Sequence, residues 1–129
     1  MKFYVKNDVL TTDDKWPTTV LGAKIASIQK WFNVRKLKPL SPGGRDTCAL
    51  CKMFYTSPLN SYTECTDCPI LKITGKSTCN GTPHYKACRQ LTRDPGTYYI
   101  DREIRFLISL LPGLGWLRRG MKQEDDNYA

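Results

Sequence analysis

The stretch that decides the fold runs from Cys48-Ala-Leu-Cys51 to Cys65-Thr-Asp-Cys68. It holds two C-x2-C pairs with 13 residues between them. Two residues between paired cysteines let both sulfurs face one point, and a spacer of hairpin length brings the second pair back to the first. Four thiolates around one tetrahedral ion suit zinc best. The sequence therefore predicts a zinc site made by Cys48, Cys51, Cys65 and Cys68.

The residues around the two pairs predict the layout of this metal module. The β-like runs Lys52–Tyr55 and Ser61–Glu64 predict a hairpin. After the second pair, Pro69 can take the first helical position and Gly75 the C-terminal stop, so a helix of one to two turns is expected to begin near Cys68. A knuckle, a hairpin and a short helix form the layout of treble-clef and zinc-ribbon modules.

Other interpretations of the cysteines stay open. Four cysteines with a proline after the last also occur in iron–sulfur sites, so a cluster is the alternative to zinc. A thioredoxin-like C-x-x-C redox centre needs a βαβ context that this sequence does not offer. Disulfides are disfavoured because the protein is expected inside the cell, where thiols stay reduced.

A third group of candidate ligands follows in Cys79-x4-His84-x3-Cys88. Its spacing is close to that of zinc-knuckle ligands. Two independent four-ligand sites would need eight Cys or His residues and the chain supplies seven, so a second site would need a carboxylate, a water or a shared sulfur. Alternatively, one of these residues replaces a member of the first four. The plainest interpretation makes Cys79 and Cys88 small buried residues and His84 a satisfied polar side chain.

Two amphipathic helices are predicted, over residues 18–33 and 98–111. Apolar residues recur in both at i, i+4, i+7 and i+11, as they do on one face of a helix. The two stripes are Leu21, Ile25, Ile28 and Phe32 in the first helix, and Ile100, Ile104, Leu107 and Leu111 in the second. We expect the second stripe to be core, since an apolar stripe at helical spacing is more often core than interface.

The 129 residues are expected to form one α+β domain. At its centre lies a small zinc-ribbon or treble-clef-like module over residues 48–88, flanked by the helices 18–33 and 98–111. Residues 1–17 first alternate in polarity, which predicts a short strand and a loop. Residues 118–129 form a polar tail.

Several short motifs accompany the cysteine pairs, namely Pro69-Ile70, Thr74-Gly75, Cys79 and the run Gly81-Thr82-Pro83-His84-Tyr85. Together with the pairs, this segment resembles a pattern seen in small cysteine-rich proteins of tailed bacteriophages, most of them without assigned function. The likeness covers roughly a third of the chain. In those proteins an aromatic residue follows the T-P pair, whereas here His84 stands between Pro83 and Tyr85. The resemblance implies a phage origin and a metal-binding core, and it implies no activity.

The charge balance favours an anionic partner. Lys and Arg number 20 against 12 Asp and Glu, a net charge of +8. Basic residues with aromatic neighbours gather in residues 24–52 and 72–93, and each one that reaches a phosphate releases counterions. We therefore predict nucleic-acid binding without sequence specificity. The predicted contacts are Lys24, Lys30, Arg35, Lys36, Lys38, Arg45, Lys76, Lys86, Arg89 and Arg93.

Two alternatives stand beside this function. The lysines of helix 18–33 can simply be its solvated face. The protein can also act as an inhibitor that docks on a host enzyme or defence complex, with zinc purely structural. Trp16, Trp31 and Trp116 are candidate contacts for such a partner.

Catalysis is not expected. Four thiolates around zinc leave no position for water, and His84, the one histidine, lacks the glutamate two residues later that a zinc-deaminase signature requires. The longest apolar window, residues 106–117, is too short for a membrane span, and we find no export signal. We expect a cytoplasmic protein, in the host cell if it is phage-encoded, with neither a membrane nor a small-molecule substrate as its partner.

Overall fold

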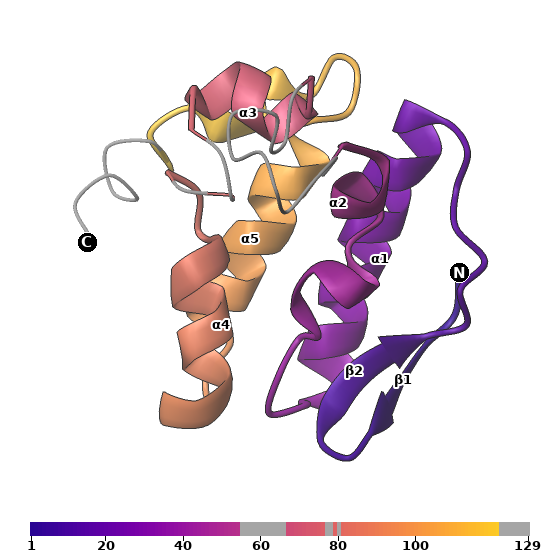
Figure 1. Cartoon of the computed structure of the whole chain (residues 1–129). Coiled ribbons are helices and arrows are strands. Elements are labelled where there is room, and N and C mark those ends of the chain that lie inside the picture. Colours follow the sequence, from indigo (N-terminus) through magenta and orange to yellow (C-terminus); the bar gives the residue numbers. More distant parts are fainter. Residues whose placement is uncertain (55–66, 77–78, 80, 122–129) are drawn as a thin grey trace.

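The computed structural model describes residues 1–54, 67–76, 79 and 81–121 (Figure 1). These residues form a mixed fold of helices and one antiparallel two-stranded sheet, which confirms the predicted α+β class. The elements in chain order are β1 (Phe3–Lys6), β2 (Val9–Thr12), α1 (Val20–Leu37), the 3-10 turn η1 (Gly44–Thr47), α2 (Ala49–Phe54), α3 (Pro69–Thr74), α4 (His84–Arg93), α5 (Tyr98–Ile108) and the 3-10 turn η3 (Gly115–Arg118).

Helix α5 is the centre of the packing. It contacts α1 and α4, and α1 in turn contacts α2 and β1. Figure 1 accordingly shows α4 and the β1–β2 hairpin on opposite sides of the molecule. Ile100, Ile104 and Leu107 of α5 are buried, so the prediction that this stripe is core is confirmed for these three residues, whereas Leu111, beyond the end of the helix, is half-buried. The helix ends at Ile108, three residues before its predicted end.

The N-terminal residues form a hairpin where the sequence analysis predicted a strand and a loop. Asn7 and Asp8 both have positive φ, at 53° and 64°, which is the two-residue turn that matches the twist of antiparallel strands. Lys6 of β1 pairs with Val9 of β2. The buried Leu10 of β2 donates its N–H to the carbonyl of Ser41 at 2.9 Å, so the hairpin is joined to the segment that follows α1.

Helix α1 begins at Val20, two residues after its predicted start, and the Thr19 hydroxyl caps it by accepting a hydrogen bond from the Gly22 N–H at 3.0 Å. It runs four residues past the predicted end and stops at Lys38, whose φ is 51°. The predicted orientation of its apolar stripe is wrong. Only Ile28 of that stripe is buried, whereas Leu21, Ile25 and Phe32 are 49%, 41% and 47% exposed.

The buried face of α1 combines small and aromatic residues with two polar ones. Its members are Ala23, Ala26, Ser27, Ile28, Lys30, Trp31 and Val34. The two alanines let α1 approach its neighbours closely, and Trp31 supplies a large apolar surface. A prediction based on the aliphatic residues alone therefore assigns the buried face of α1 to the wrong side of the helix.

The described segments next to the cysteines, residues 49–54 and 69–74, are helical. Residues 52–54 belong to α2, so the predicted strand is wrong there, whereas Tyr55 and the run Ser61–Glu64 lie outside the described residues. The Lys52 N–H bonds the Cys48 carbonyl at 2.9 Å, as in a helical turn. The short helix after Cys68 is confirmed as α3, with Pro69 first and Gly75 stopping it at a φ of 71°. A zinc-ribbon hairpin is thus not confirmed by the described part of the chain.

Helix α4 was not foreseen by the sequence analysis, and it is bonded to the start of α5. The Oε1 atom of Gln90 accepts hydrogen bonds from the N–H groups of Tyr99 at 2.8 Å and Ile100 at 3.2 Å. This side chain satisfies two of the donors that every helix leaves open at its first turn. Among the described helices, none combines the length and apolar character needed to cross a bilayer.

Candidate metal centre and basic surfaces

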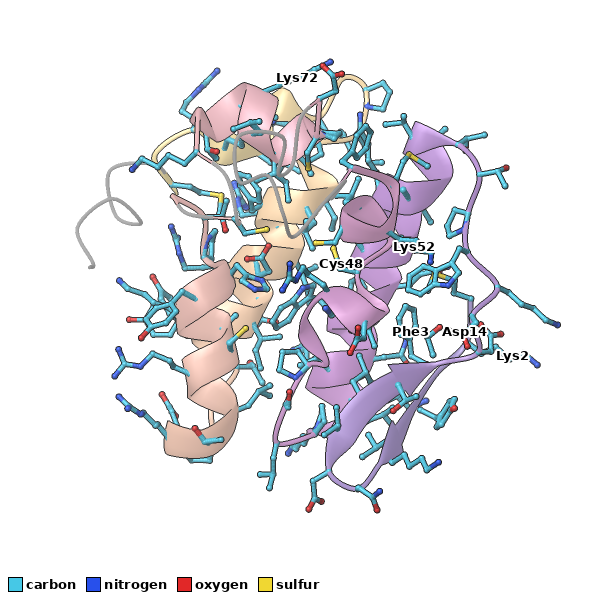
Figure 2. The ribbon with its side chains drawn as sticks, in the orientation of Figure 1. Lys2, Phe3, Asp14, Cys48, Lys52 and Lys72 are labelled. Atoms are coloured by element: carbon cyan, nitrogen blue, oxygen red, sulfur yellow. The ribbon has the colours of Figure 1, made fainter. Side chains whose placement is uncertain are left out.

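The first cysteine pair lies at the start of α2. The Cys51 N–H donates a hydrogen bond of 3.2 Å to the Cys48 sulfur. A hydrogen bond from the Cys51 thiol lowers the pKa of Cys48, and the same bond raises the pKa of Cys51. One sulfur of the pair therefore carries charge readily while its neighbour holds the proton. Figure 2 shows Cys48 near the centre of the molecule.

Two more cysteines come to the same place from other segments. Cys68 is the buried N-cap residue of α3, and Cys79 lies between α3 and α4. Cys48, Cys51, Cys68 and Cys79 together line one small cavity of about 10 Å³, which Leu50, Ile70, Leu71 and Lys76 also line. Three of these four cysteines belong to the predicted zinc site, and Cys79 was predicted as an additional ligand or as a replacement for one of the first four.

Cys65, the fourth member of the predicted zinc site, lies outside the described residues. Within residues 1–54, 67–76, 79 and 81–121, no three Cys, His, Asp or Glu side chains are close enough to hold a metal ion as they stand. The five described cysteines form no disulfide with one another. Four of these five free cysteines line the small cavity, and Cys88 does not.

A larger cavity of about 390 Å³ adjoins these thiols. It is lined by Cys48, Cys51 and Cys79, and also by two buried charged residues, Lys30 and Glu103. Both charged residues are 2% exposed. A buried ammonium beside several thiols favours their thiolate forms through its charge.

Lys30 was predicted as a nucleic-acid contact, and its burial removes it from the surface. Its Nζ donates a hydrogen bond of 3.0 Å to the Gly44 carbonyl and lies 5.9 Å from the centre of the Trp31 ring. Lys30 occupies the buried face of α1, so the interpretation of this lysine as part of a solvated face is also wrong. Sequence spacing alone gave no signal for this placement.

His84 and Cys88 contact each other across one turn of α4. The Cys88 sulfur lies 3.6 Å from His84 Nε2, and the His84 ring meets Trp31 edge to face at 5.6 Å between centroids. Burial, helped by the charge of Lys30, lowers the pKa of His84 to about 4. Burial raises the pKa of Cys88 to about 11. At neutral pH both side chains are therefore uncharged.

Helix α4 also carries the best-defined basic surface. Lys86, Arg89 and Arg93 follow one another at i, i+3 and i+7, and α4 contains no acidic residue. Together with Gln90, Asp94 and Tyr99 they line an open hollow of about 240 Å³. We call Lys86, Arg89 and Arg93 the α4 basic face.

Aromatic rings accompany the α4 basic face. Lys86 Nζ lies 5.3 Å from the Tyr99 ring centre, and the Arg89 guanidinium lies 5.4 Å from that of Tyr85. Tyr85 is exposed. Asp94, the one acidic residue that lines the hollow, already accepts a hydrogen bond of 2.8 Å from the Gly96 N–H.

The other predicted basic contacts are more scattered. Arg35 is paired with Asp101 at 3.1 Å, so its charge is partly offset. Lys36, Lys38 and Arg45 are exposed, and Lys24 is half-buried. Lys24, Arg35 and Lys36 belong to α1, Lys38 is its C-cap and Arg45 belongs to η1, so none of them is part of α4.

A second basic hollow was missed by the sequence analysis. It measures about 740 Å³ and is lined by Lys76, Arg118 and Arg119 together with Trp116, whose side chain is 60% exposed. The segments that form it are α3, the residues before α4, α5 and η3. The Arg118-Arg119 pair close to Trp116 could have indicated a basic surface with an aromatic ring. The proximity of these residues to Lys76 could not be predicted, because it depends on the packing of segments far apart in the sequence.

Three residues of the apolar stripe of α1 face outward and form an exposed apolar surface. Leu21, Ile25 and Phe32 form it, and we call these three residues the α1 stripe. The last turn of the same helix is basic, with Arg35 and Lys36. A group of exposed apolar residues on one helix face indicates an interaction site more strongly than single exposed residues do.

Comparison of the chain with protein-family models, with curated proteins and with solved structures found no match. The likeness to cysteine-rich phage proteins therefore stays a prediction.

Proposed function

We propose that this chain is a small basic module, stabilised by a metal ion bound to its cysteines, that binds nucleic acid through the α4 basic face. The observation that carries the proposal is the alignment of Lys86, Arg89 and Arg93 on a helix without a single acidic residue. A row of cations on one helix face can follow successive phosphates, and this electrostatic term needs no base sequence.

The α4 basic face is the better candidate because two of the basic residues of α1 are ion-paired or buried. Arg35 is held by Asp101, and Lys30 is buried. On α4, by contrast, Arg89 and Arg93 are exposed, and this helix packs against α5. Their charge is available to a phosphate backbone.

Aromatic side chains extend the same surface chemistry. Tyr85 beside Arg89 and the exposed Trp116 beside Arg118 and Arg119 offer rings on which unpaired bases can stack. Stacking on tyrosine or tryptophan accepts any base, which agrees with binding that is not sequence-specific. Single-stranded nucleic acid is therefore the form we expect to be bound best.

Zinc has a structural role in this proposal. The four cysteines that line the small cavity come from the start of α2, the N-cap of α3 and the segment before α4, and an ion bound among them would hold these short elements together. Four thiolates leave no open position on zinc, so the protein is proposed as a binding module and not as an enzyme. An iron–sulfur cluster is the alternative occupant, and a brown protein carrying iron would identify it.

The test is fluorescence anisotropy with labelled random-sequence single-stranded DNA over a series of salt concentrations. Three phosphate contacts predict a slope of log affinity against log salt of about −2. The variant R89Q/R93Q should bind more weakly, with a slope reduced to about −0.7.

The matched control is K2Q/K6Q, which removes the same charge from the hairpin side of the molecule, where Figure 2 labels Lys2. This variant should bind like the wild-type protein. Affinity that does not fall with salt, or equal weakening by both double variants, would contradict binding through the α4 basic face.

The α1 stripe favours a second candidate function, the inhibition of a protein partner. An apolar helix face ending in Arg35 and Lys36 is complementary to an apolar groove with an acidic rim on a host enzyme or complex. The variant I25K/F32K should then lose a partner that R89Q/R93Q retains after nuclease treatment. Sedimentation of the purified protein separates this case from self-association, which the same variant would abolish.

A further inference from the structure

We infer that one zinc ion is bound by Cys48, Cys51, Cys68 and Cys79, and that Cys79 takes the place predicted for Cys65. The inference rests on the metal-stabilised core of the proposed function and not on nucleic-acid binding. The spacing of the two C-x2-C pairs predicted Cys65 as the fourth ligand, and the inference assigns Cys79 instead.

The first support is the shared cavity. The four cysteines come from the start of α2, the N-cap of α3 and the segment before α4, yet all four line one space of about 10 Å³. A space of this size holds roughly one water molecule. It suits a single ion better than an iron–sulfur cluster, whose several iron and sulfide atoms need more room.

The second support is the backbone of Cys79. Its φ is 62°, in the left-handed region that a cysteine rarely adopts. The other described non-glycine residues with positive φ are asparagine or aspartate, which tolerate this region, and Lys38, which ends α1. Cys79 is neither an asparagine or aspartate nor the residue that ends a helix. Unusual backbone conformations of this kind concentrate at functional sites. The conformation places Cys79 on the same cavity as the other three cysteines.

The third support is the polar surroundings of the sulfurs. The Cys51 N–H donates to the Cys48 sulfur, a bond that offsets part of the charge on a metal-bound thiolate. Lys30 lines the adjoining cavity with Cys48, Cys51 and Cys79. Zinc with four thiolates carries a net charge of −2, so a buried ammonium nearby is a suitable counter-charge.

Binding requires a local adjustment of the side chains. No three metal-ligand side chains in the described part of the chain are yet close enough to hold an ion. Zinc–sulfur bonds are about 2.3 Å long, so rotation of the cysteine side chains must bring the sulfurs inward onto the cavity. The cavity that would receive the ion already lies between the segments that carry these four cysteines.

The experiment is native mass spectrometry of zinc-loaded protein with one cysteine at a time replaced by serine. The wild-type protein should carry one zinc ion. The variants C48S, C51S, C68S and C79S should lose it, whereas C65S and C88S should retain it. C88S is the matched control for C79S, because Cys88 is also half-buried but does not line the small cavity.

Because a ligand variant can fail to fold, a second measurement uses the unaltered protein. Zinc-loaded wild-type protein is treated with a thiol-alkylating reagent, and the modified cysteines are mapped by peptide mass. Cys79 should be protected and Cys65 modified. The opposite pattern, together with zinc retained by C79S and lost by C65S, would overturn this ligand set while leaving a zinc core intact. Wild-type protein that binds no zinc would overturn both the ligand set and the proposed metal-stabilised core.

Discussion

Lys30 Nζ donates a hydrogen bond of 3.0 Å to the carbonyl oxygen of Gly44, so the ammonium group of α1 ends inside the protein beside the cysteine segment. This contact joins the middle of α1 to η1, the turn that leads into Cys48. Lys30 also lines the cavity of about 390 Å³ that adjoins the proposed metal site. Lysine is rarely buried to this extent without a charged or polar partner.

Replacing Lys30 with methionine should weaken zinc binding. The variant removes the counter-charge near the thiolates while keeping the length of the side chain. Changes to groups that support metal ligands commonly reduce affinity about 10- to 100-fold, and we expect a loss in this range. Competition with a chromophoric chelator measures it. Lys24→Met, on the same helix but away from the cavity, is the control and should bind zinc normally.

Trp31 and Phe32 are adjacent in sequence but face opposite ways, at 3% and 47% exposure. Trp31→Ala should lower the free energy of unfolding by about 3–5 kcal/mol, because it removes a buried ring. Phe32→Ala should change it by less than about 1 kcal/mol. Urea denaturation of both variants measures the difference. Similar losses for the two would mean that α1 is rotated relative to the orientation described.

The buried His84 should make stability depend on pH. Burial lowers its pKa to about 4 in the folded state, below the ordinary histidine value of 6.5. The unfolded chain therefore binds more protons between these values, so this contribution is complete above about pH 6.5 and is lost as the pH falls toward 4. The loss amounts to about 3 kcal/mol.

Denaturation of wild-type protein and His84→Gln at matched pH values isolates this effect. The stability difference between the two proteins should shrink on acidification, since glutamine does not titrate. Parallel pH profiles for the two proteins would show that His84 ionises normally in the folded state.

Gln90 should matter for stability more than an exposed glutamine does. Gln90→Leu keeps the approximate size but leaves the N–H groups of Tyr99 and Ile100 without their acceptor. We expect a loss of about 1–3 kcal/mol in the free energy of unfolding. Gln29→Leu on the exposed side of α1 is the matched control and should be close to neutral. Thermal denaturation followed by circular dichroism compares the two variants.

Local signals predicted some elements well. The proline and glycine around α3 predicted both its ends, and the aliphatic stripe of α5 predicted its buried face. In each case the residues that carry the pattern lie within the element or directly beside it. The turn at Asn7 and Asp8 carried a similar local signal for the hairpin, but the sequence analysis did not use it.

Other features depend on contacts that the sequence does not reveal. The stripe rule ranked leucine, isoleucine and phenylalanine above alanine, yet Ala23 and Ala26 face the neighbouring helices because they allow close approach. The strand predicted at Lys52 gave way to α2, since most of its residues are good helix formers. The place of Cys79 beside Cys48 and Cys68 results from the packing of three separate segments.

The link between Leu10 and Ser41 has a consequence for the behaviour of the protein at high concentration. A short parallel bridge between Val9 and Ser41 covers the outer side of β2, so β1 is the edge strand of the sheet within the described part of the chain. Edge strands can recruit strands from other molecules and start aggregation. Here the edge strand is only four residues long and is flanked by Lys2 and Lys6, whose like charges repel a second copy. The hairpin is thus protected against intermolecular strand addition by its brevity and its charge.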